Sequence, residues 1–231
     1  MTQAGSEPMP GVQAVLFDLD GTFADTAPDM ARALNALRIQ RGLEPIPLSV
    51  LRPHVSSGAR GMLEAGFNIR PADTGFPELR DAFHEEYANN LCVESRWFDG
   101  ISAVVDDLEG RDIAWGIVTN KAIRFTLPLL AALAITPRAA CVVCGDTCAR
   151  AKPHPDPLLH AAALIGINPE NCLYVGDDER DIHAANAAGM RGIVAMYGYL
   201  GISTEPQTWP AAAWVHLPAD ITALIPVLPS A

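Results

Sequence analysis

Short apolar runs alternate with helical patterns along the C-terminal part of the chain. Five of these runs are rich in β-branched residues, as buried strands are. They cover residues 113–119, 139–144, 171–177, 192–197 and 212–217. Three segments with apolar residues at helical spacing lie between them, at 121–135, 155–166 and 179–190. Strands and helices that alternate in this way form parallel sheets with helices on both faces, so the pattern predicts an α/β fold.

The first predicted strand stands apart from this series. It covers residues 13–17, and no strand pattern follows it for a long stretch of chain. Residues 26–95 instead show helical periodicity, most clearly at 27–42 and 77–91, with prolines and glycines between the helical stretches. An all-helical insert of this length predicts a second, smaller domain on top of the sheet.

The domain boundaries follow from the limits of this insert. We expect the chain to leave the sheet near Asp25 and to return near Phe98. The predicted catalytic core therefore consists of residues 1–25 and 96–231, and a helical cap consists of residues 26–95.

Composition and charge limit the classes of protein to which this chain can belong. The 231 residues are 49% hydrophobic, which is enough for a large core, and the formal net charge is −11. This charge disfavours nucleic acid and anionic membranes as partners, because both require concentrated positive charge. The N-terminal residues lack a basic region followed by an apolar one, and no apolar run approaches the roughly 18 residues of a membrane span. We therefore expect a soluble, cytoplasmic protein.

The cysteines and histidines do not indicate a metal site. The five cysteines are odd in number, and the CVVC sequence has no second CxxC partner. In a strand, Cys141 and Cys144 point to opposite faces, which favours buried core residues over a redox pair. The six histidines show no spacing typical of metal ligands on a common face.

Polar residues follow the predicted strands at the points where a ligand site is expected. In open α/β sheets this site lies at the carboxyl ends of the strands. The residues concerned are Asp18 and Asp20 after the first strand, Thr119 and Asn120 after the second, Lys152 in a loop before a helix, and Asp177, Asp178 and Asp181 near a later strand end. Converging carboxylates form an oxygen-rich site that suits Mg²⁺, and a hydroxyl, an amide and a lysine are donors for a phosphoryl group.

Four short motifs in this order resemble those of the haloacid dehalogenase superfamily of phosphotransferases. The first is DxDGT, which stands here as Asp18-Leu19-Asp20-Gly21-Thr22. The others are Thr119 at a strand end, Lys152 in KPHPDP, and the acidic GDDERD of residues 176–181. The resemblance spans nearly the whole chain, and the insert is similar to the small helical cap of phosphoglycolate phosphatase and its relatives.

The resemblance implies a mechanism. Asp18 would be the nucleophile that forms an aspartyl-phosphate, and Asp20 would protonate the leaving oxygen and then activate water. The side chains of Asp18 and Asp177 and the backbone carbonyl of Asp20 would hold Mg²⁺. Thr119, Asn120 and Lys152 would hold the phosphoryl oxygens.

Further positions receive supporting roles. Asp181 would orient the site through hydrogen bonds, and Asp25 would support the hinge into the cap or act as a plain helix cap. Whether Asp178 or Asp181 contacts the metal is left open by the sequence.

The cap sequence bears on the substrate. In the stretch VSSGARGML, Gly58 permits a tight turn and Arg60 begins a helical run that would direct a guanidinium at a carboxylate of the substrate. The alternative is an exposed helix residue. The segments SSGAR, WGIVTNK and MYGY resemble the branch of the family that dephosphorylates N-acetylmuramic acid 6-phosphate. The expected partner is thus a small phosphate ester, 2-phosphoglycolate or N-acetylmuramic acid 6-phosphate, bound by a monomer or dimer.

Four alternatives are weighed against the phosphatase. Dehalogenases of the family need neither an acid such as Asp20 nor Mg²⁺. A phosphomutase uses the same four motifs and stays an alternative, whereas a non-catalytic relative would lack at least one of the key residues. A nucleotide-binding domain would need a glycine-rich loop where this chain has DLDGTFAD.

Overall fold

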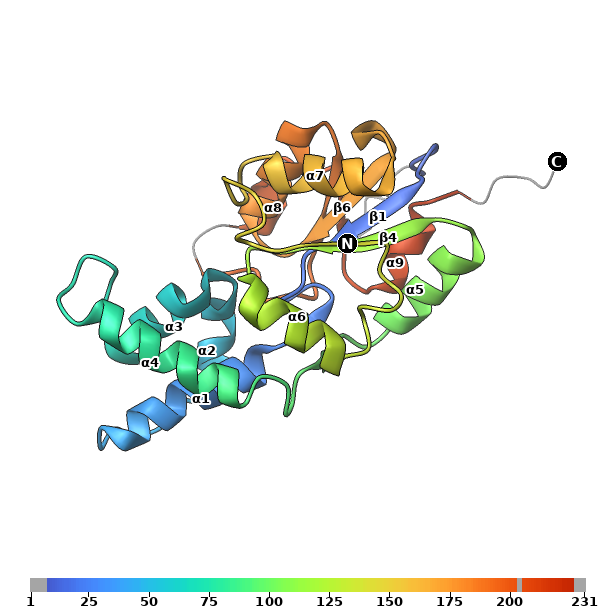
Figure 1. Ribbon diagram of the computed structural model, residues 1–231. Helices are drawn as coiled ribbons and strands as arrows, with labels where there is room; N and C mark the ends of the chain where they lie inside the picture. The colour runs from blue at the N-terminus through green and yellow to red at the C-terminus, as the bar shows by residue number, and fades with distance from the viewer. Residues whose placement is uncertain (1–7, 203–204, 227–231) are drawn as a thin grey trace.

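A six-stranded parallel sheet forms the centre of the protein (Figure 1). The computed structural model describes residues 8–202 and 205–226. The strands are β1 (Ala14–Phe17), β4 (Ala114–Val118), β5 (Cys141–Val143), β6 (Cys172–Gly176), β7 (Arg191–Ala195) and β8 (Ala213–Val215). Their order is β5-β4-β1-β6-β7-β8, so β1 lies between β4 and β6. The predicted α/β fold with a parallel sheet is confirmed.

Helices cover both faces of this sheet. Helices α7 (Asp156–Ile165) and α8 (Glu179–Ala188) lie on one face, and α5 (Ile101–Gly110) and α9 (Ala219–Ala223) lie on the other (Figure 1). Every residue of β1 is buried because its side chains alternate between the two layers. Val15 packs with the residues of α5 and α9, whereas Leu16 packs with those of α7 and α8.

The predicted elements are present with small differences at their ends. Each predicted strand starts and stops within two residues of the observed one, and the predicted helices correspond to α6 (Ile123–Ala132), α7 and α8. Helices α5 and α9 were not predicted. The five residues of α9 are too few to show a period, and α5 contains two adjacent valines, which are typical of strands.

The insert after β1 is helical, as the sequence predicts. Its elements are α1 (Ala27–Gln40), α2 (Leu48–Leu51), the 3-10 helix η1 (Arg52–Ser57), α3 (Gly58–Phe67) and α4 (Phe76–Asn89). They surround their own buried cluster, which includes Leu34, Met62 and Phe83, and they lie beyond the carboxyl ends of the strands (Figure 1). We refer to residues 26–95 as the cap, and these limits stay a prediction.

A short antiparallel ribbon connects the cap to the sheet. Strands β2 (Ala24–Asp25) and β3 (Arg96–Trp97) pair where the chain leaves the sheet and where it returns. Two more 3-10 turns, η2 (Pro169–Asn171) and η3 (Pro206–Thr208), lie in the core. In the described part of the chain, all helices are too short or too polar to cross a membrane.

Candidate active site

Three neighbouring strands end at the same level and deliver polar residues to one place. Phe17, the last residue of β1, is in register with Ile117 of β4 and Val175 of β6. The next residues along the chain are therefore brought close together, among them Asp18 after β1 and Asp177 after β6. This register is the physical reason that motifs far apart in the sequence form one site.

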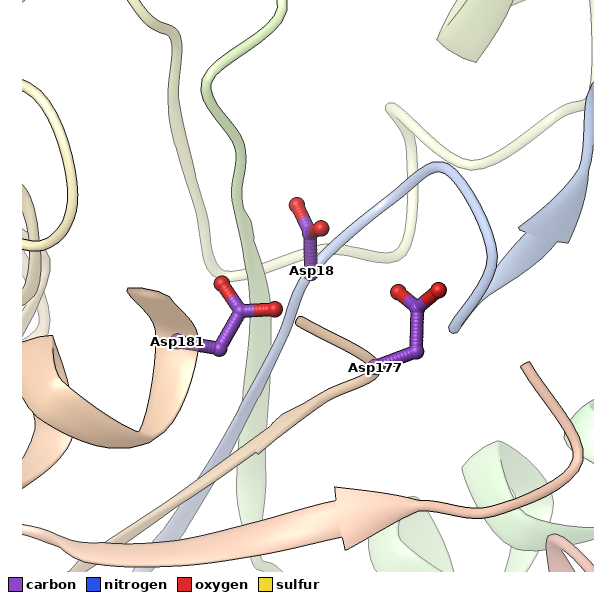
Figure 2. Close-up of side chains that lie close together, drawn as sticks. All are labelled: Asp18, Asp177 and Asp181. Carbon is purple, nitrogen blue, oxygen red and sulfur yellow. The ribbon is translucent and has the colours of Figure 1, made fainter. Parts of the chain in front are cut away.

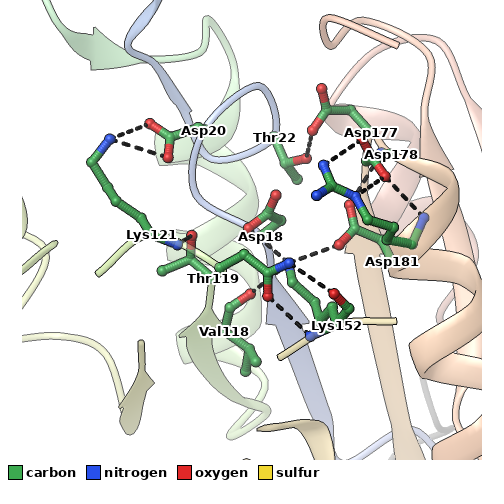
Figure 3. Close-up of polar contacts among 12 residues, drawn as sticks. Asp18, Asp20, Thr22, Val118, Thr119, Lys121, Lys152, Asp177, Asp178 and Asp181 are labelled. Atoms are coloured by element: carbon green, nitrogen blue, oxygen red, sulfur yellow. Dashed lines mark hydrogen bonds and ion pairs between the residues drawn. The ribbon is translucent and has the colours of Figure 1, made fainter. Parts of the chain in front are cut away.

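Lys152 lies at the centre of this site. Its Nζ atom is 2.9 Å from Asp18 Oδ1 and 2.7 Å from Asp181 Oδ1 (Figure 3). It also donates to Val118 O at 3.1 Å and to Tyr174 Oη at 2.7 Å. Burial lowers the pKa of Lys152, but the two carboxylates outweigh it and hold the pKa above its usual value. The ammonium is therefore a fixed positive charge beside Asp18.

Asn120 holds the loop that carries this lysine. Its Nδ2 donates to Lys152 O at 2.9 Å, and its Oδ1 accepts from Lys152 N at 3.0 Å. This pair gives the Asn120 amide a positioning role, while the second Nδ2 proton stays available and Asn120 lines the cavity over the site, so the expected phosphoryl contact stays a prediction. The Thr119 hydroxyl accepts from Lys121 N at 3.1 Å and retains its own proton for donation.

Three carboxylates converge beside Lys152. One oxygen from each of Asp18, Asp177 and Asp181 lies within 4.8 Å of the others, and the three come from different segments (Figure 2). Burial, reinforced by Asp18 and Asp181, raises the pKa of Asp177 well above its usual value. Burial likewise raises the pKa of Asp181 to about 7, although Lys152 opposes this.

This acidic cluster fits a divalent cation. One lysine does not balance three carboxylates, of which Asp177 and Asp181 are buried and Asp18 is half-buried, and like charges at such distances are costly without a further positive charge. Oxygen ligands are those that Mg²⁺ prefers. The expected ligands Asp18 and Asp177 both belong to the cluster, together with Asp181, while the side chain of Asp20 lies outside it.

The DxDGT glycine and threonine explain how Asp177 is held. Thr22 Oγ1 donates to Asp177 Oδ1 at 3.0 Å, and Tyr199 N donates to Oδ2 at 2.9 Å. Ser56, from the cap, donates to the same Oδ2 at 3.2 Å. Gly21 has a φ of +89°, and a Cβ there would collide with the Asp177 carboxylate. Thr22, Ser56 and Tyr199 all lie in segments that were singled out in the sequence, but none of them was assigned a role there.

Asp20 turns toward a lysine that sequence analysis missed. Lys121 Nζ is 3.0 Å and 3.2 Å from the two carboxylate oxygens of Asp20, and Thr26 Oγ1 donates to Oδ1 at 2.5 Å. The same Nζ lies 4.7 Å from the ring centre of Tyr87, a cap residue. The sequence did contain a signal that could have identified Lys121, because Lys121 and Lys152 are the only lysines in the chain.

Asp178 contacts an arginine and is absent from the acidic cluster. It caps α8 by accepting from Arg180 N at 2.9 Å, and Asp181 Oδ2 accepts from Asp178 N at 3.1 Å. Arg180 Nε also lies 2.7 Å from Asp178 Oδ1. Burial raises the pKa of Asp178, but Arg180 reverses the direction and the net pKa is lowered. Arg180 Nη2 in addition donates to Ser56 O at 2.7 Å, which links core and cap.

A cavity of about 300 Å³ lies over the site, between the core and the cap. Its floor carries Asp18, Asp20, Thr119, Lys152 and Asp181, whereas Asp177 is not among its lining residues. The cap and α6 add a largely apolar wall. The wall residues are Met30, Val55, Phe83, Tyr87 and Phe125.

Arg60 and Asp25, which were also singled out in the sequence, lie outside this cavity. Arg60 is exposed and lines a separate depression with His54 and Glu64, so the structure does not bring it to Asp18. Asp25 lies in β2, where its carboxylate is 2.8 Å from Arg52 Nη1 and accepts from Tyr199 Oη at 3.0 Å. These contacts place Asp25 at the junction with the cap.

Known proteins resemble this chain over most of its length. Residues 15–195 match the family model of haloacid dehalogenase-like hydrolases. An N-acetylmuramic acid 6-phosphate phosphatase from Pseudomonas putida is 37% identical over 93% of this chain and 96% of its own length. A phosphoglycolate phosphatase from Xanthomonas campestris is 44% identical over 90% of this chain and 94% of its own length.

Solved structures are similar as well. A predicted phosphoglycolate phosphatase from Haemophilus somnus has a TM-score of 0.78 at 25% identity, with 93% of this chain and 98% of that chain covered. A putative phosphoglycolate phosphatase from Lactobacillus delbrueckii has a TM-score of 0.80 at 24% identity, with 92% and 98% covered, which shows the shared fold.

Proposed function

Because the chain is a phosphatase of the haloacid dehalogenase-like hydrolase family, we propose that it hydrolyses a small phosphate monoester that carries a carboxylate. The observation that carries the proposal is the position of Asp18. It lies at the floor of the cavity, beside the ammonium of Lys152 and within the acidic cluster.

In the proposed reaction, a carboxylate oxygen of Asp18 attacks phosphorus while the bond from phosphorus to the ester oxygen breaks. Asp20, in its protonated form, gives its proton to that leaving oxygen. Asp20 then takes a proton from water, which attacks phosphorus, releases phosphate and restores the Asp18 carboxylate. These steps require Asp20 to reach the same phosphate ester as Asp18, and both residues line the same cavity.

The other residues stabilise the transferred group. Lys152 and the Thr119 hydroxyl are donors for the phosphoryl oxygens. Asp18, Asp177 and the backbone carbonyl of Asp20 would hold Mg²⁺, with Asp181 beside them in the acidic cluster. Bound Mg²⁺ supplies positive charge that reduces the repulsion between carboxylates and phosphate. Asn120 and Asp181 keep Lys152 in place through the contacts described above.

The cavity favours the larger of two candidate substrates. The relatives named above comprise an N-acetylmuramic acid 6-phosphate phosphatase and a phosphoglycolate phosphatase. A volume of about 300 Å³ lies at the lower end of the range for drug-sized ligands, and three aromatic side chains line it. A sugar ring would cover this apolar wall, whereas the two carbons of phosphoglycolate would leave it bare. We therefore favour the amino-sugar phosphate.

Release of inorganic phosphate tests the proposal. The panel contains 2-phosphoglycolate, N-acetylmuramic acid 6-phosphate, other sugar phosphates and nucleotides, each with Mg²⁺ or with EDTA. We expect turnover with Mg²⁺ that EDTA and Asp18→Asn both reduce to background. Asp107→Asn, a surface change at an ion pair with Arg111, is the matched control and should retain full activity.

Two results would contradict the proposal. Turnover that persists in Asp18→Asn would exclude this residue as the nucleophile. A wild-type protein that releases phosphate from no ester would favour a mutase or a ligand-binding role.

A further inference from the structure

Arg124 extends from the start of α6 into the cavity that contains Asp18. Its Nη2 atom lies 2.9 Å from Nδ1 of His84, which belongs to cap helix α4. Its guanidinium carbon lies 4.5 Å from the centre of the Phe125 ring. The side chain is exposed and also lines a second depression with Asp81 and Glu85, so it borders both the cavity and the solvent.

The charges around the cavity single out this arginine. Four cationic side chains line it, namely Lys121, Arg124, Lys152 and Arg180. Lys152 is paired with Asp18, Lys121 with Asp20, and Arg180 with Asp178. Among the residues that the structure describes, Arg124 contacts no carboxylate, and its polar partner is His84. Within the described part of the chain, the cavity therefore has one cation whose charge is left for a ligand.

His84 orients Arg124 without neutralising it. A guanidinium has only donor groups, so Nδ1 of His84 accepts and the ring proton is on Nε2. Burial and the adjacent Arg124 lower the pKa of His84, which keeps the ring neutral at neutral pH. Arg124 is thus held over the Phe125 ring by a neutral partner, and the remaining donors are free for a bidentate contact.

We propose that Arg124 is a specificity-determining residue that binds the carboxylate on the leaving group of the substrate. The inference rests on the proposed function, because it requires the phosphate of the same molecule to lie at Asp18. The apolar wall, with Phe83, Tyr87 and Phe125, would contact the body of the leaving group between these two anionic ends. Arg124 takes the role that the sequence suggested for Arg60, which lies outside the cavity.

Matched pairs of substrates test this assignment. N-acetylmuramic acid 6-phosphate and N-acetylglucosamine 6-phosphate differ in the lactyl group that carries the carboxylate. 2-Phosphoglycolate and 2-hydroxyethyl phosphate form a second pair. We expect Arg124→Gln to raise KM about tenfold or more for the carboxylate member of the preferred pair, and to leave KM for its neutral partner unchanged. An unchanged KM for the neutral partner would also show that the variant is folded.

Two further arginine variants serve as comparisons. Arg70→Gln changes an exposed cap residue paired with Glu64 and should match the wild type on every ester. Arg60→Gln tests the position suggested by the sequence. An equal KM effect on both members of a pair, or a selective effect of Arg60→Gln in place of Arg124→Gln, would overturn the inference.

A binding measurement separates this inference from the proposed function. In the Asp18→Asn background, calorimetry compares the affinity of each carboxylate ester with that of its neutral partner. We expect Arg124→Gln to abolish the preference for the carboxylate. If turnover is absent but this preference is present and depends on Arg124, the hydrolase proposal fails and the subsite stands. If no preference exists in the protein with Arg124 intact, the subsite is refuted even where hydrolysis is observed.

Discussion

At the scale of single residues, the contact between Lys121 and Asp20 connects the reaction to the cap. The pair is nearly buried, with 8% and 16% of the two side chains exposed. Burial lowers the pKa of Lys121, but Asp20 and Tyr87 raise it above its usual value, so the lysine stays charged. Lys121 therefore fixes the proposed general acid, and it does so while packed against a ring from α4.

Replacing Lys121 with methionine should impair proton transfer. The variant removes the contact that fixes the Asp20 carboxyl group, so we expect kcat to fall about tenfold for alkyl phosphates, a part of the 10²- to 10⁴-fold typical of a general acid. p-Nitrophenyl phosphate has a leaving group that needs no proton, and its turnover should change little. Steady-state kinetics on the two ester types measures the difference. An equal loss on both would show that Lys121 acts only on the fold.

His84 gives a prediction that is independent of activity. Burial is the largest cause of its lowered pKa, and Arg124, Arg80 and Lys121 add to it while Asp81 opposes them. Because the folded protein disfavours the charged ring, this residue lowers stability as the pH falls below the usual histidine value. Arg124→Gln should move the pKa of His84 upward, toward 6.5, as measured by an NMR titration of the ring. Arg70→Gln, which changes an exposed pair with Glu64, is the control and should leave the pKa of His84 unchanged.

Residue identities alone predicted part of this site. Asp18, Thr119 and Asp177 follow strand ends, and the register of the sheet brings them together, whereas Lys152 joins them from the loop before α7. The direction of an individual side chain was beyond the sequence. For example, Asn120 was expected at the phosphoryl group but bonds to the backbone of Lys152, a contact between residues 32 positions apart.

At the scale of elements, the start of α1 depends on a distant tyrosine. No side chain of its own N-terminus caps this helix. Instead, Tyr199 Oη accepts from Thr26 N at 2.8 Å and from Ala27 N at 2.9 Å, and it donates to Asp25 at 3.0 Å. One phenol thus satisfies two helix donors and a carboxylate at the junction of core and cap.

Tyr199→Phe should therefore destabilise this junction. The change leaves two buried N–H groups unsatisfied, which we expect to cost about 1–3 kcal/mol of unfolding free energy. Tyr197→Phe is the matched control, because Tyr197 Oη makes a single hydrogen bond, to Thr22 O at 3.1 Å. Urea unfolding of both variants measures the difference. Equal free energies for the two would show that the helix start does not depend on this cap.

Element lengths explain which parts of the fold the sequence predicted. The strands of the sheet are buried on both faces and appear as apolar runs, so they were found within two residues. The ribbon of β2 and β3 has two residues in each strand, too few for any period. The connection between sheet and cap was therefore inferred from where the helical pattern starts and stops.

At the scale of the whole molecule, the position of the cap relative to the sheet determines the cavity. Ser56 donates to Asp177, and His84 contacts Arg124, across 121 and 40 positions of the chain. Such contacts depend on how two units pack, which periodicity within each unit does not encode. This is the reason that the sequence predictions lacked the apolar wall and chose Arg60 in place of Arg124, while the catalytic floor was present in them.

One contact, between Arg180 and Ser56, is placed to hold the cap against the core. Arg180 Nη2 donates to Ser56 O at 2.7 Å, while its ion pair with Asp178 fixes the guanidinium on α8. Arg180→Gln removes this link, and the global stability should change by about 1 kcal/mol or less because the ion pair is partly exposed. We expect faster amide hydrogen exchange confined to residues 52–59, measured by mass spectrometry.

Arg150→Gln, which breaks a surface pair with Asp156, should leave exchange in that segment unchanged. Uniformly faster exchange across the sheet would mean that Arg180 supports the core, and unchanged exchange in 52–59 would mean that other contacts hold the cap in place.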